Sequence, residues 1–452
     1  FHWKLEQPHS SYLITLAVSE FNEFHDTLGD LPVDYYVLKN VDEERARRFL
    51  DKTPRMIAFF NEVVGQAYPY PKYAQVCLPE FNGGMENTSA TSMTDEALMD
   101  RVEALERNLD DLVAHELAHQ WFGDMLTCKA WSSVWLNEGF ASYFAPLFLE
   151  HEQGEDEFRL QMQSELSSYL GSDRTYRRPI VEPRYEDAVQ LFDGMSYSKG
   201  ACVLHALRGL VGDDAWWKGI KRYVAVNKFR NVGTDDLRLA FEVVSDRDLA
   251  WFFDQWVFKA GHPELKASWR YEPEDRSTRL KVEQVQVLDE QTPLFRLPTS
   301  VTVVYGPGRT ESIPVVVDGA SHEFVLPAKE RPQAVLLDAQ GWLPKVLEFE
   351  RPIAEHLFLL EHGPNVLVRL EAARILASKS GENPKIKPAL AEAWKAELST
   401  TAKVKLVEIL ASARDEAYRA SLAAAAGDDA PRVRVAALNG LASLPRDDAA
   451  ED

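Results

Sequence analysis

Two histidines four residues apart, with a glutamate directly after the first, most constrain what this 452-residue chain can fold into. On an α-helix, residues i and i+4 share a face, so His115 and His119 can present two imidazoles to one metal ion. Glu116 stands where such helices carry a general base, and Glu138 follows His119 after eighteen intervening residues. A His/His/Glu set leaves one position of a tetrahedral zinc ion open, as a catalytic site requires. The pattern therefore predicts a zinc hydrolase.

The alternative is that these letters arose by chance on an amphipathic helix whose polar face meets solvent. The flanking residues Val113, Leu117 and Trp121 are apolar, so we expect one side of this helix to be buried. Burying two histidines and a glutamate without partners would be costly. The flanks, together with Glu138, favour the metal site.

Composition limits the classes of protein that need to be considered. Hydrophobic residues make up 45% and charged residues 27%, as in soluble globular proteins, and the length suggests about three domains. A net charge of −21 argues against nucleic acid or an anionic membrane surface as a partner. Three cysteines give no disulfide framework, and no apolar run is long enough to span a membrane. The compartment stays open between cytoplasm and export.

The beginning of the chain suggests a fragment. Phe1 is not an initiator Met and starts no signal peptide, and Ser11–Val18 (SYLITLAV) is apolar enough for a buried strand. We expect residues 1–20 to be the remnant of an amino-terminal β-domain that is otherwise missing.

Residues 21–262 carry mostly helical patterns and end in a Gly-His-Pro boundary. The pattern predicts, in order, one helix over Asp42–Gly65, a strand over Tyr73–Leu78, a largely helical stretch over Asp95–Leu126 and a helix over Glu138–Glu150. We expect this part to form the catalytic domain.

The residue pattern changes twice towards the carboxyl end of the chain. Over residues 263–350, short β-rich segments (Leu280–Leu288, Val301–Tyr305 and Ile313–Val317) alternate with Pro and Gly turns, which predicts a β-sandwich. Over residues 351–452 the tetrads ILAS, ILAS and GLAS recur, starting at Ile375, Ile409 and Gly440. This spacing indicates HEAT-like helical repeats, with a non-repetitive bundle as the alternative. We expect the repeat array to be incomplete and the acidic tail Asp447–Asp452 to be disordered.

Three motifs stand in order along the chain: Gly83-Gly84-Met85-Glu86-Asn87, then His115-Glu116-Leu117-Ala118-His119 with Glu138, then Ser196-Tyr197-Ser198-Lys199-Gly200. Together they resemble the gluzincin aminopeptidases, the family of aminopeptidase N and leukotriene hydrolase. The resemblance is dense over residues 11–262 and looser beyond. It implies a multidomain α+β protein with a thermolysin-like catalytic domain, a β-sandwich domain and an α-helical HEAT-like repeat domain.

The resemblance also implies a role for each motif residue. His115, His119 and Glu138 would hold one Zn²⁺ per chain, which lowers the pKa of its water to about 7. Glu116 would take the proton from that water, and Tyr197 would hydrogen-bond the oxyanion of the tetrahedral intermediate. For Tyr197 taken alone, a buried core tyrosine is the commoner case, so its role rests on the match to the Tyr-x-Lys-Gly motif.

The first motif would make the enzyme an exopeptidase. The carboxylate of Glu86 would pair with the free α-ammonium of a peptide, and Gly83 and Gly84 would let the substrate backbone approach. Met85 and Asn87 complete this substrate-binding segment, and the loop Asn87–Met93 is expected to shape the first specificity pocket. A plain tight turn is the alternative explanation of the two glycines. The implied function is hydrolysis of the amino-terminal bond of peptides.

Two other functions are compatible with the same motifs. One is hydrolysis of an epoxide or another small molecule, and the other is a binding scaffold on an inactive peptidase fold. Orientation of the metal-ligating imidazoles could fall to Asp124, to Asn137 or to backbone carbonyls. The sequence is silent on the preferred amino-terminal residue, the natural substrate and the oligomeric state.

Overall fold

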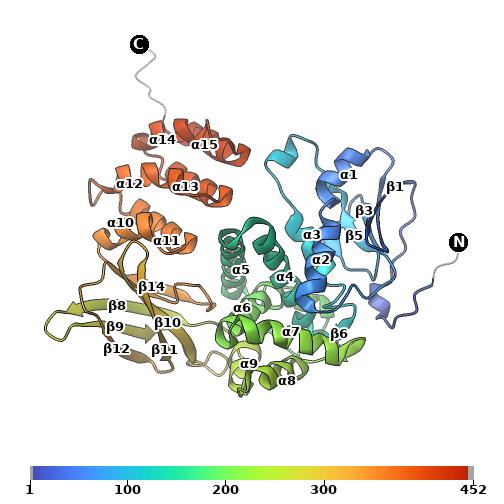
Figure 1. Ribbon diagram of the computed structural model, residues 1–452, viewed down its shortest axis with the longest axis horizontal. Coiled ribbons are helices and arrows are strands. Elements are labelled where there is room, and N and C mark those ends of the chain that lie inside the picture. Colours follow the sequence, from blue (N-terminus) through green and yellow to red (C-terminus); the bar gives the residue numbers. More distant parts are fainter. Residues whose placement is uncertain (1–3, 446–452) are drawn as a thin grey trace, which may run out of the picture. The chain divides into compact units, whose positions relative to one another are not determined.

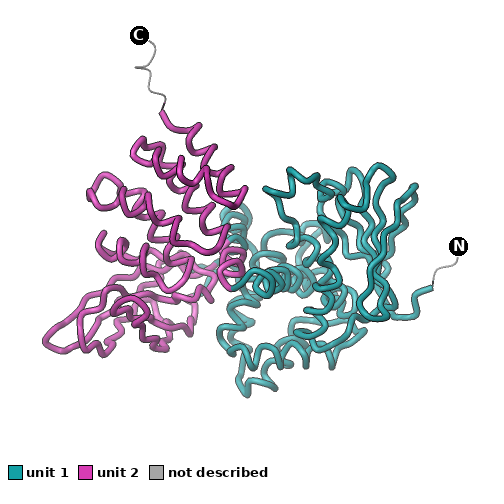
Figure 2. The backbone as a smooth tube through the Cα atoms, turned by 45° about the horizontal axis from the view of Figure 1, so that its top comes forward, with its two compact units in different colours: residues 1–154, 164–261, 288–293 teal, residues 155–163, 262–287, 294–452 magenta. Residues whose placement is uncertain are grey.

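The structure is a computed structural model that describes residues 4–445, so the tail Asp447–Asp452 lies outside the described part (Figure 1). The fold is mixed α+β, and the chain forms two compact units (Figure 2). Unit 1 comprises the residues up to 154 together with 164–261 and 288–293, and unit 2 comprises 155–163, 262–287 and the residues from 294 onward.

Unit 1 contains a five-stranded sheet in the order β1-β2-β3-β5-β4. Its strands are β1 (Phe21–Leu28), β2 (Leu31–Leu38), β3 (Tyr73–Leu78), β4 (Gly84–Met85) and β5 (Thr91–Thr94). β1 and β2 form an antiparallel hairpin, β3 runs parallel to both β2 and β5, and the short β4 pairs antiparallel with β5 at the edge. The strand predicted over Tyr73–Leu78 is confirmed.

The helices of unit 1 and a small parallel pair of strands follow from residue 43 to residue 257. They are α1 (Glu43–Leu50), α2 (Thr53–Val64), α3 (Asp110–Ala118), β6 (Leu126–Cys128), α4 (Trp135–Gln153), α5 (Glu155–Thr175), α6 (Gly200–Val211), α7 (Asp213–Asn227), β7 (Arg230–Val232), α8 (Thr234–Ser245) and α9 (Ala250–Val257). The first residues of α5 belong to unit 2. Short 3₁₀ turns lie at Ser11–Leu13, Asp95–Ala97, Glu103–Leu105, Trp131–Ser133 and Ala188–Leu191, and a π-helical turn lies at Met195–Lys199.

The single helix predicted over Asp42–Gly65 is wrong, although both of its ends are right. The Asp42 carboxylate accepts a hydrogen bond from the backbone of Arg45, and Gly65 ends α2 at a φ of 72°. Between them the chain breaks into α1 and α2. Pro54 lies at the start of α2, because it has no N–H and its ring would clash with a carbonyl one turn earlier in a continuous helix.

The helical stretch predicted over Asp95–Leu126 is also too long, because only α3 within it is α-helical. The side chain of Asp100 accepts hydrogen bonds from the backbone of Val102 and Glu103, and the side chain of Asn108 accepts one from Asp110. Such local side-chain bonds offer the backbone an alternative to a helix. α3 therefore begins late, just ahead of the first histidine.

The strand predicted over Ser11–Val18 is not formed. Leu13 is buried, but Ile14, Leu16 and Val18 are 66%, 86% and 83% exposed, and the backbone of this segment pairs with no strand among the described residues. Apolar residues form a strand only where a neighbouring strand supplies hydrogen bonds. The segment instead makes one 3₁₀ turn at Ser11–Leu13.

The helix predicted over Glu138–Glu150 is confirmed and extends further, from Trp135 to Gln153. It is buried almost throughout its length and packs against α3 and α6. The ring of Phe140 stacks on that of Phe122 at 4.4 Å, and Phe144 lies 4.7 Å from the same ring. This aromatic cluster fixes α4 beside the segment that follows α3.

After the first residues of α5, unit 2 continues with two sheets. The strands are β8 (Glu264–Glu272), β9 (Ser277–Gln284), β10 (Leu297–Gly306), β11 (Arg309–Val317), β12 (Ser321–Pro327), β13 (Ala334–Leu337) and β14 (Val346–Glu350). One sheet has the order β12-β9-β8-β14 and the other β11-β10-β13. The strands predicted over Val301–Tyr305 and Ile313–Val317 are confirmed, whereas the one predicted to reach Leu288 ends at Gln284, where the apolar residues turn to solvent.

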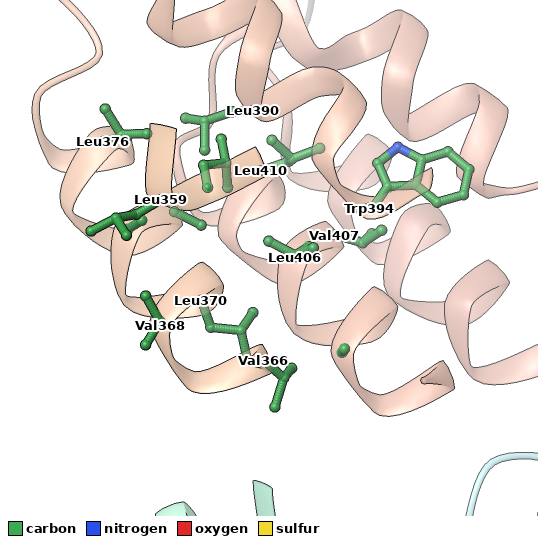
Figure 3. Close-up of a cluster of buried hydrophobic side chains, with 14 of the residues drawn as sticks. Leu359, Val366, Val368, Leu370, Leu376, Leu390, Trp394, Leu406, Val407 and Leu410 are labelled. Carbon is green, nitrogen blue, oxygen red and sulfur yellow. The ribbon is translucent and has the colours of Figure 1, made fainter. Parts of the chain in front are cut away.

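Helices complete unit 2: α10 (Ile353–His362), α11 (Val366–Ser378), α12 (Ile386–Ala393), α13 (Thr400–Ser412), α14 (Arg419–Ala425) and α15 (Pro431–Ser443), with 3₁₀ turns at Trp394–Ala396 and Glu416–Tyr418. Aliphatic side chains of successive helices interlock in one buried cluster, which includes Leu359, Leu376 and Leu410 (Figure 3). Within residues 4–445, no helix combines the length and the apolar character needed to cross a membrane.

Candidate active site

Helices α3 and α4 bring His115, His119 and Glu138 together. The Nε2 atoms of the two histidines lie 3.2 Å apart, and the Oε2 atom of Glu138 lies 3.6 Å from His115 Nε2 and 3.2 Å from His119 Nε2. Ligands of a tetrahedral zinc ion at 2.0–2.1 Å are separated by roughly 3.3–3.4 Å. The three atoms thus have the spacing that one zinc ion requires, and this group could hold a metal ion.

Burial makes a cation at this place chemically reasonable. His119 is 1% exposed, Glu138 3% and Glu116 5%. Burial lowers the pKa of His119, but the carboxylates of Glu138 and Glu86 outweigh it and raise that pKa well above its ordinary value. Burial alone would raise the pKa of Glu138, yet His119 and His115 hold it below its ordinary value. The cluster therefore attracts positive charge to the point where the three donor atoms meet.

A backbone carbonyl, rather than Asp124 or Asn137, orients the second histidine. The Nδ1 atom of His119 contacts the carbonyl oxygen of Phe122 at 3.0 Å, so its Nε2 atom is left free towards Glu138. Asn137 instead accepts a hydrogen bond from the backbone of Cys128. Asp124 is buried near Glu86 and His119, and burial raises the pKa of its carboxyl well above the ordinary value.

Glu116 lies against the glycine of the edge strand β4. Its Oε2 atom is buried and has no hydrogen-bond partner in the described residues, and burial raises its pKa well above the ordinary value. A Cβ atom on Gly84 would fall inside the carboxylate of Glu116, far closer than the 3.0 Å that real Cβ atoms keep. Only glycine leaves room for this carboxylate, which points to a space shared with Glu86 and His119.

The other residues of the first motif, Gly83 and Met85 to Asn87, lie in or directly beside β4. Glu86 is 6% exposed, and burial raises the pKa of its carboxyl against the lowering effect of His119. Gly83 accepts a hydrogen bond from the backbone of Thr94 and has a φ of 69°. Met85 pairs with Ser92 in the sheet, and the buried side chain of Asn87 is used within the protein, donating to the Leu13 carbonyl and accepting from the Ser92 hydroxyl.

Tyr197 stands on the π-helical turn that precedes α6. Its ring is parallel to that of His115, with a 6° interplanar angle and 6.0 Å between centroids. Burial, followed by Glu138, raises the pKa of the phenol, so the hydroxyl stays a proton donor. π-Helical turns occur frequently at functional sites because they re-aim one side chain within a helix. Asp193 caps the turn by accepting a hydrogen bond from the backbone of Met195.

Gly139 and Gly200 set the distance between α4, which carries Glu138, and the turn that carries Tyr197. The sequence predicted no role for either glycine. The Cα atom of Gly139 lies within 3.0 Å of where a Cβ atom on Gly200 would stand, and the reverse is nearly as close. Gly139 follows Glu138, and Gly200 belongs to the Tyr197 motif, so their place beside motif residues was the available signal. This contact joins α4 to α6.

Tyr12 is the other residue that sequence reasoning missed. Its hydroxyl accepts a hydrogen bond from the side chain of Asn137 at 3.1 Å, next to Glu138. No local pattern could reveal this contact, since 125 residues separate the two side chains.

Comparison with known proteins finds similarity to a peptidase domain and to aminopeptidases. The model of the peptidase family M1 domain matches residues 48–256. Tricorn protease-interacting factor F2 of Thermoplasma volcanium is 30% identical over 67% of this chain and 39% of its own length. Aminopeptidase N of Lactobacillus delbrueckii subsp. lactis is 32% identical over 57% of this chain and 32% of its own length. The chain thus matches only about a third of the length of these curated relatives.

A solved structure shares the fold. Aminopeptidase A of Legionella pneumophila, in complex with aspartic acid, superposes with a TM-score of 0.70 over 97% of this chain and 52% of that chain, at 19% identity. This likeness concerns the fold alone. Residues 48–256, which contain the site-bearing helices α3 and α4, match the peptidase family M1 domain, and an aminopeptidase N is among the similar curated proteins.

Proposed function

We propose that this protein is a zinc-dependent aminopeptidase that hydrolyses the amino-terminal peptide bond of peptides. The observation that carries the proposal is the meeting of His115, His119 and Glu138 at the spacing of zinc ligands, beside two buried carboxylates. A metal alone would suit many hydrolases. The second group of nearby donor atoms, Glu86, Glu116 and His119, is what favours an exopeptidase.

His115, His119 and Glu138 would hold one zinc ion per chain. When bound, zinc would lower the pKa of a water molecule and polarise the scissile carbonyl. The spacing of the two histidines supports this assignment, because their Nε2 atoms lie 3.2 Å apart. Without a metal ion between them, their lone pairs would repel each other or the two atoms would have to share a proton.

Glu116 would act as general base and then as general acid. Its carboxylate is buried and lies against Gly84, and one of its oxygens has no hydrogen-bond partner within residues 4–445. Burial raises the pKa of this carboxyl, which makes its carboxylate a stronger base that can accept a proton from water and return it to the leaving amine. Tyr197 would donate its phenolic hydrogen to the oxyanion, and its raised pKa keeps that hydrogen in place.

Glu86 would select substrates with a free amino terminus. Its buried carboxylate lies near Glu116 and His119, so a peptide ammonium paired with it would sit one residue from the hydrolysed bond. Gly83, Gly84 and Met85 offer a backbone edge to the substrate, because β4 is the last strand of its sheet. For Asn87 we propose a supporting role, since its side chain holds the loop.

For the architecture we propose a thermolysin-like catalytic domain over residues 21–262, a β-sandwich over 263–350 and HEAT-like repeats over 351–452. The repeat proposal rests on α11, α13 and α15, which are 13 residues long and end in the recurring tetrads. In each, the final serine hydroxyl donates to the carbonyl three residues earlier. Arg369 of α11 pairs with Glu397 ahead of α13, and Lys403 of α13 pairs with Asp428 ahead of α15, one repeat later.

The test is hydrolysis of a panel of aminoacyl anilides, each with a free or an acetylated α-amine, before and after removal of zinc with a chelator. We expect release from free-amine substrates only, loss of activity on chelation and its return with added zinc. Glu86→Gln should raise KM for free-amine substrates by more than tenfold, because a charge-assisted pair contributes about 1.5–3 kcal/mol. Glu182→Gln is the control, since that carboxylate lies outside the site and pairs with Arg184.

Each other outcome would count against the proposal. Equal cleavage of acetylated substrates would mean an endopeptidase and would remove the role of Glu86. A chain that binds one zinc ion but cleaves none of the anilides would indicate a binding protein on this fold.

A further inference from the structure

Arg178 is a buried cation that lies outside the three motifs, in the loop after α5, and is only 2% exposed. Its guanidinium donates hydrogen bonds to the carbonyls of Pro179, Ile180 and Leu191, to the hydroxyl of Ser196 and to both carboxylate oxygens of Asp193. The two bonds to Asp193, at 3.0 and 2.6 Å, form a two-pronged pair, the geometry in which an arginine binds a carboxylate most strongly. A guanidinium with so many partners is held in one position.

Asp193 transmits this position to the π-helical turn. Its Oδ1 atom accepts the backbone N–H of Met195 at 2.9 Å and that of Ser196 at 3.3 Å. Its carbonyl oxygen accepts the backbone N–H of Tyr197 at 3.1 Å. Asp193 thus binds successive residues at the start of the turn, and Arg178 holds the carboxylate that makes the bonds to Met195 and Ser196.

The guanidinium also reaches the residue directly before Tyr197. Its Nη2 atom donates to the hydroxyl of Ser196 at 3.1 Å, and Ser196 is itself buried. The ring of Tyr197 lies parallel to that of His115, one of the proposed zinc ligands. Because the phenolic hydroxyl is the part of this side chain furthest from the backbone, a small rotation of the turn would move the hydroxyl most.

A purely structural role is the alternative, because removing one partner of a buried ion pair is destabilising wherever the pair lies. A second arginine of unit 1 allows the two roles to be told apart. Arg208 is 8% exposed, and its Nε atom donates to the carboxylate of Asp213 at 2.6 Å. It lies in the last turn of α6, at the opposite end of that helix from the turn of Tyr197.

We propose that Arg178 is a positioning residue for the oxyanion donor: through Asp193 and Ser196 it fixes the turn on which Tyr197 stands, and with it the phenolic hydroxyl. This inference rests on the proposed aminopeptidase function, in which Tyr197 stabilises the transition state. Because the oxyanion forms only during the reaction, loss of this positioning should lower kcat and leave KM unchanged. It should cost nothing further once the phenolic hydroxyl is absent, because no donor is then left to position.

The experiment is a double-mutant cycle on the zinc-loaded chain with a free-amine anilide as substrate. It combines Tyr197→Phe with Arg178→Lys, which keeps the positive charge but cannot form the two-pronged pair. We expect Tyr197→Phe to lower kcat roughly 10²–10³-fold and Arg178→Lys to lower it roughly tenfold, with KM unchanged within about twofold. In the protein that carries both changes, kcat should equal that of Tyr197→Phe alone.

Asp193→Asn is the second variant and decides the matter if Arg178→Lys does not fold. The side chain of Asp193 is 27% exposed, and asparagine has the same shape. Its amide keeps an oxygen for the N–H of Met195 but places an NH₂ group against the guanidinium, so kcat should fall and Tyr197→Phe should again mask the loss. Arg208→Lys is the control for the loss of a buried arginine fork. It should lower Tm as Arg178→Lys does but leave kcat unchanged.

Two results would overturn the inference. One is a kcat for both Arg178→Lys and Asp193→Asn that stays within threefold of the unaltered chain. The other is a loss that multiplies with that of Tyr197→Phe, since a structural defect lowers kcat whether or not the hydroxyl is present. Inactivity of the unaltered chain on every free-amine anilide would instead overturn the proposed function, and full activity of Tyr197→Phe would overturn the role of that phenol; this inference would fall with either.

Discussion

Replacement of Gly84 by alanine tests the most demanding contact in the site. Gly84 belongs to β4, whose backbone is held by pairing with Met93 of β5. A Cβ atom there would fall within the carboxyl group of Glu116, on Cδ, Cγ and Oε1. The strand cannot retreat without breaking its pairing, so the flexible end of Glu116 has to move.

The size of that movement follows from the geometry. To reach an ordinary van der Waals distance of 3.4 Å from the new methyl group, the carboxylate must shift by about 1 Å. Misplacement of a reacting group by about 1 Å costs on the order of 10²-fold in rate. If Glu116 is the proposed base, Gly84→Ala should lower kcat by about two orders of magnitude. Zinc content should change little, because the proposed ligands stand on α3 and α4.

The assay is steady-state hydrolysis of a free-amine anilide, with bound zinc and Tm measured on the same samples. Gly171→Ala is the control: a Cβ atom on Gly171 meets nothing within 4 Å, and alanine in its helix, α5, should stabilise slightly. A Gly84→Ala protein that keeps kcat within threefold of the unaltered chain would refute the reasoning about Glu116. Loss of zinc would show that the strain spreads to the ligands.

Two further variants probe the packing behind Glu138 and Tyr197. Gly139→Ala places a Cβ atom 3.0 Å from the Gly200 Cα atom, so α4 and α6 must separate. We expect thermal unfolding to show a loss of about 1–3 kcal/mol in stability, together with a lower kcat. Unchanged stability and kcat would contradict the contact between the two glycines. Burial, reinforced by Arg178 and Arg177, lowers the pKa of Lys199 to about 7. Between this value and the 10.5 of an unburied lysine the unfolded chain binds more protons, so stability should rise with pH by at most about 1.4 kcal/mol per unit relative to Lys199→Met. A difference in Tm between these two proteins that stays constant from pH 7 to 9 would argue against a buried neutral lysine.

The sequence predicted those parts of the site that depend on local spacing. His115 and His119 share a helical face whatever surrounds them, and the structure brings Glu138 to them from the next helix. The stacking of Tyr197 on His115 and the fit of Glu116 against Gly84 depend on tertiary packing, which no spacing rule contains. The order of the motifs pointed to Tyr197, Glu116 and Gly84, but only the structure gives the contacts that hold these residues together.

The errors in secondary structure have a similar cause. Periodicity does not register that Pro54 cannot continue α1, nor that the Asp100 side chain bonds its own backbone. The apolar alternation of Ile14, Leu16 and Val18 is typical of a strand, but a strand also needs a paired neighbour, which this segment lacks within the described residues. In each case a specific hydrogen bond, or its absence, overrides the average preference of the residues.

The site also shows why its motifs combine reactive residues with glycines. Glu138 is followed by Gly139, and Gly200 ends the motif of Tyr197. The backbones of the two glycines touch, so the proposed metal ligand Glu138 and the phenol of Tyr197 are held at a distance set by backbone contact. Gly84 does the same for Glu116 across the edge of the sheet. Side chains can adopt several rotamers, whereas contact between backbones admits little variation. The proposed reaction needs a base, a metal ligand and an oxyanion donor at fixed distances from one another, so it would depend on these glycines as much as on the groups that react.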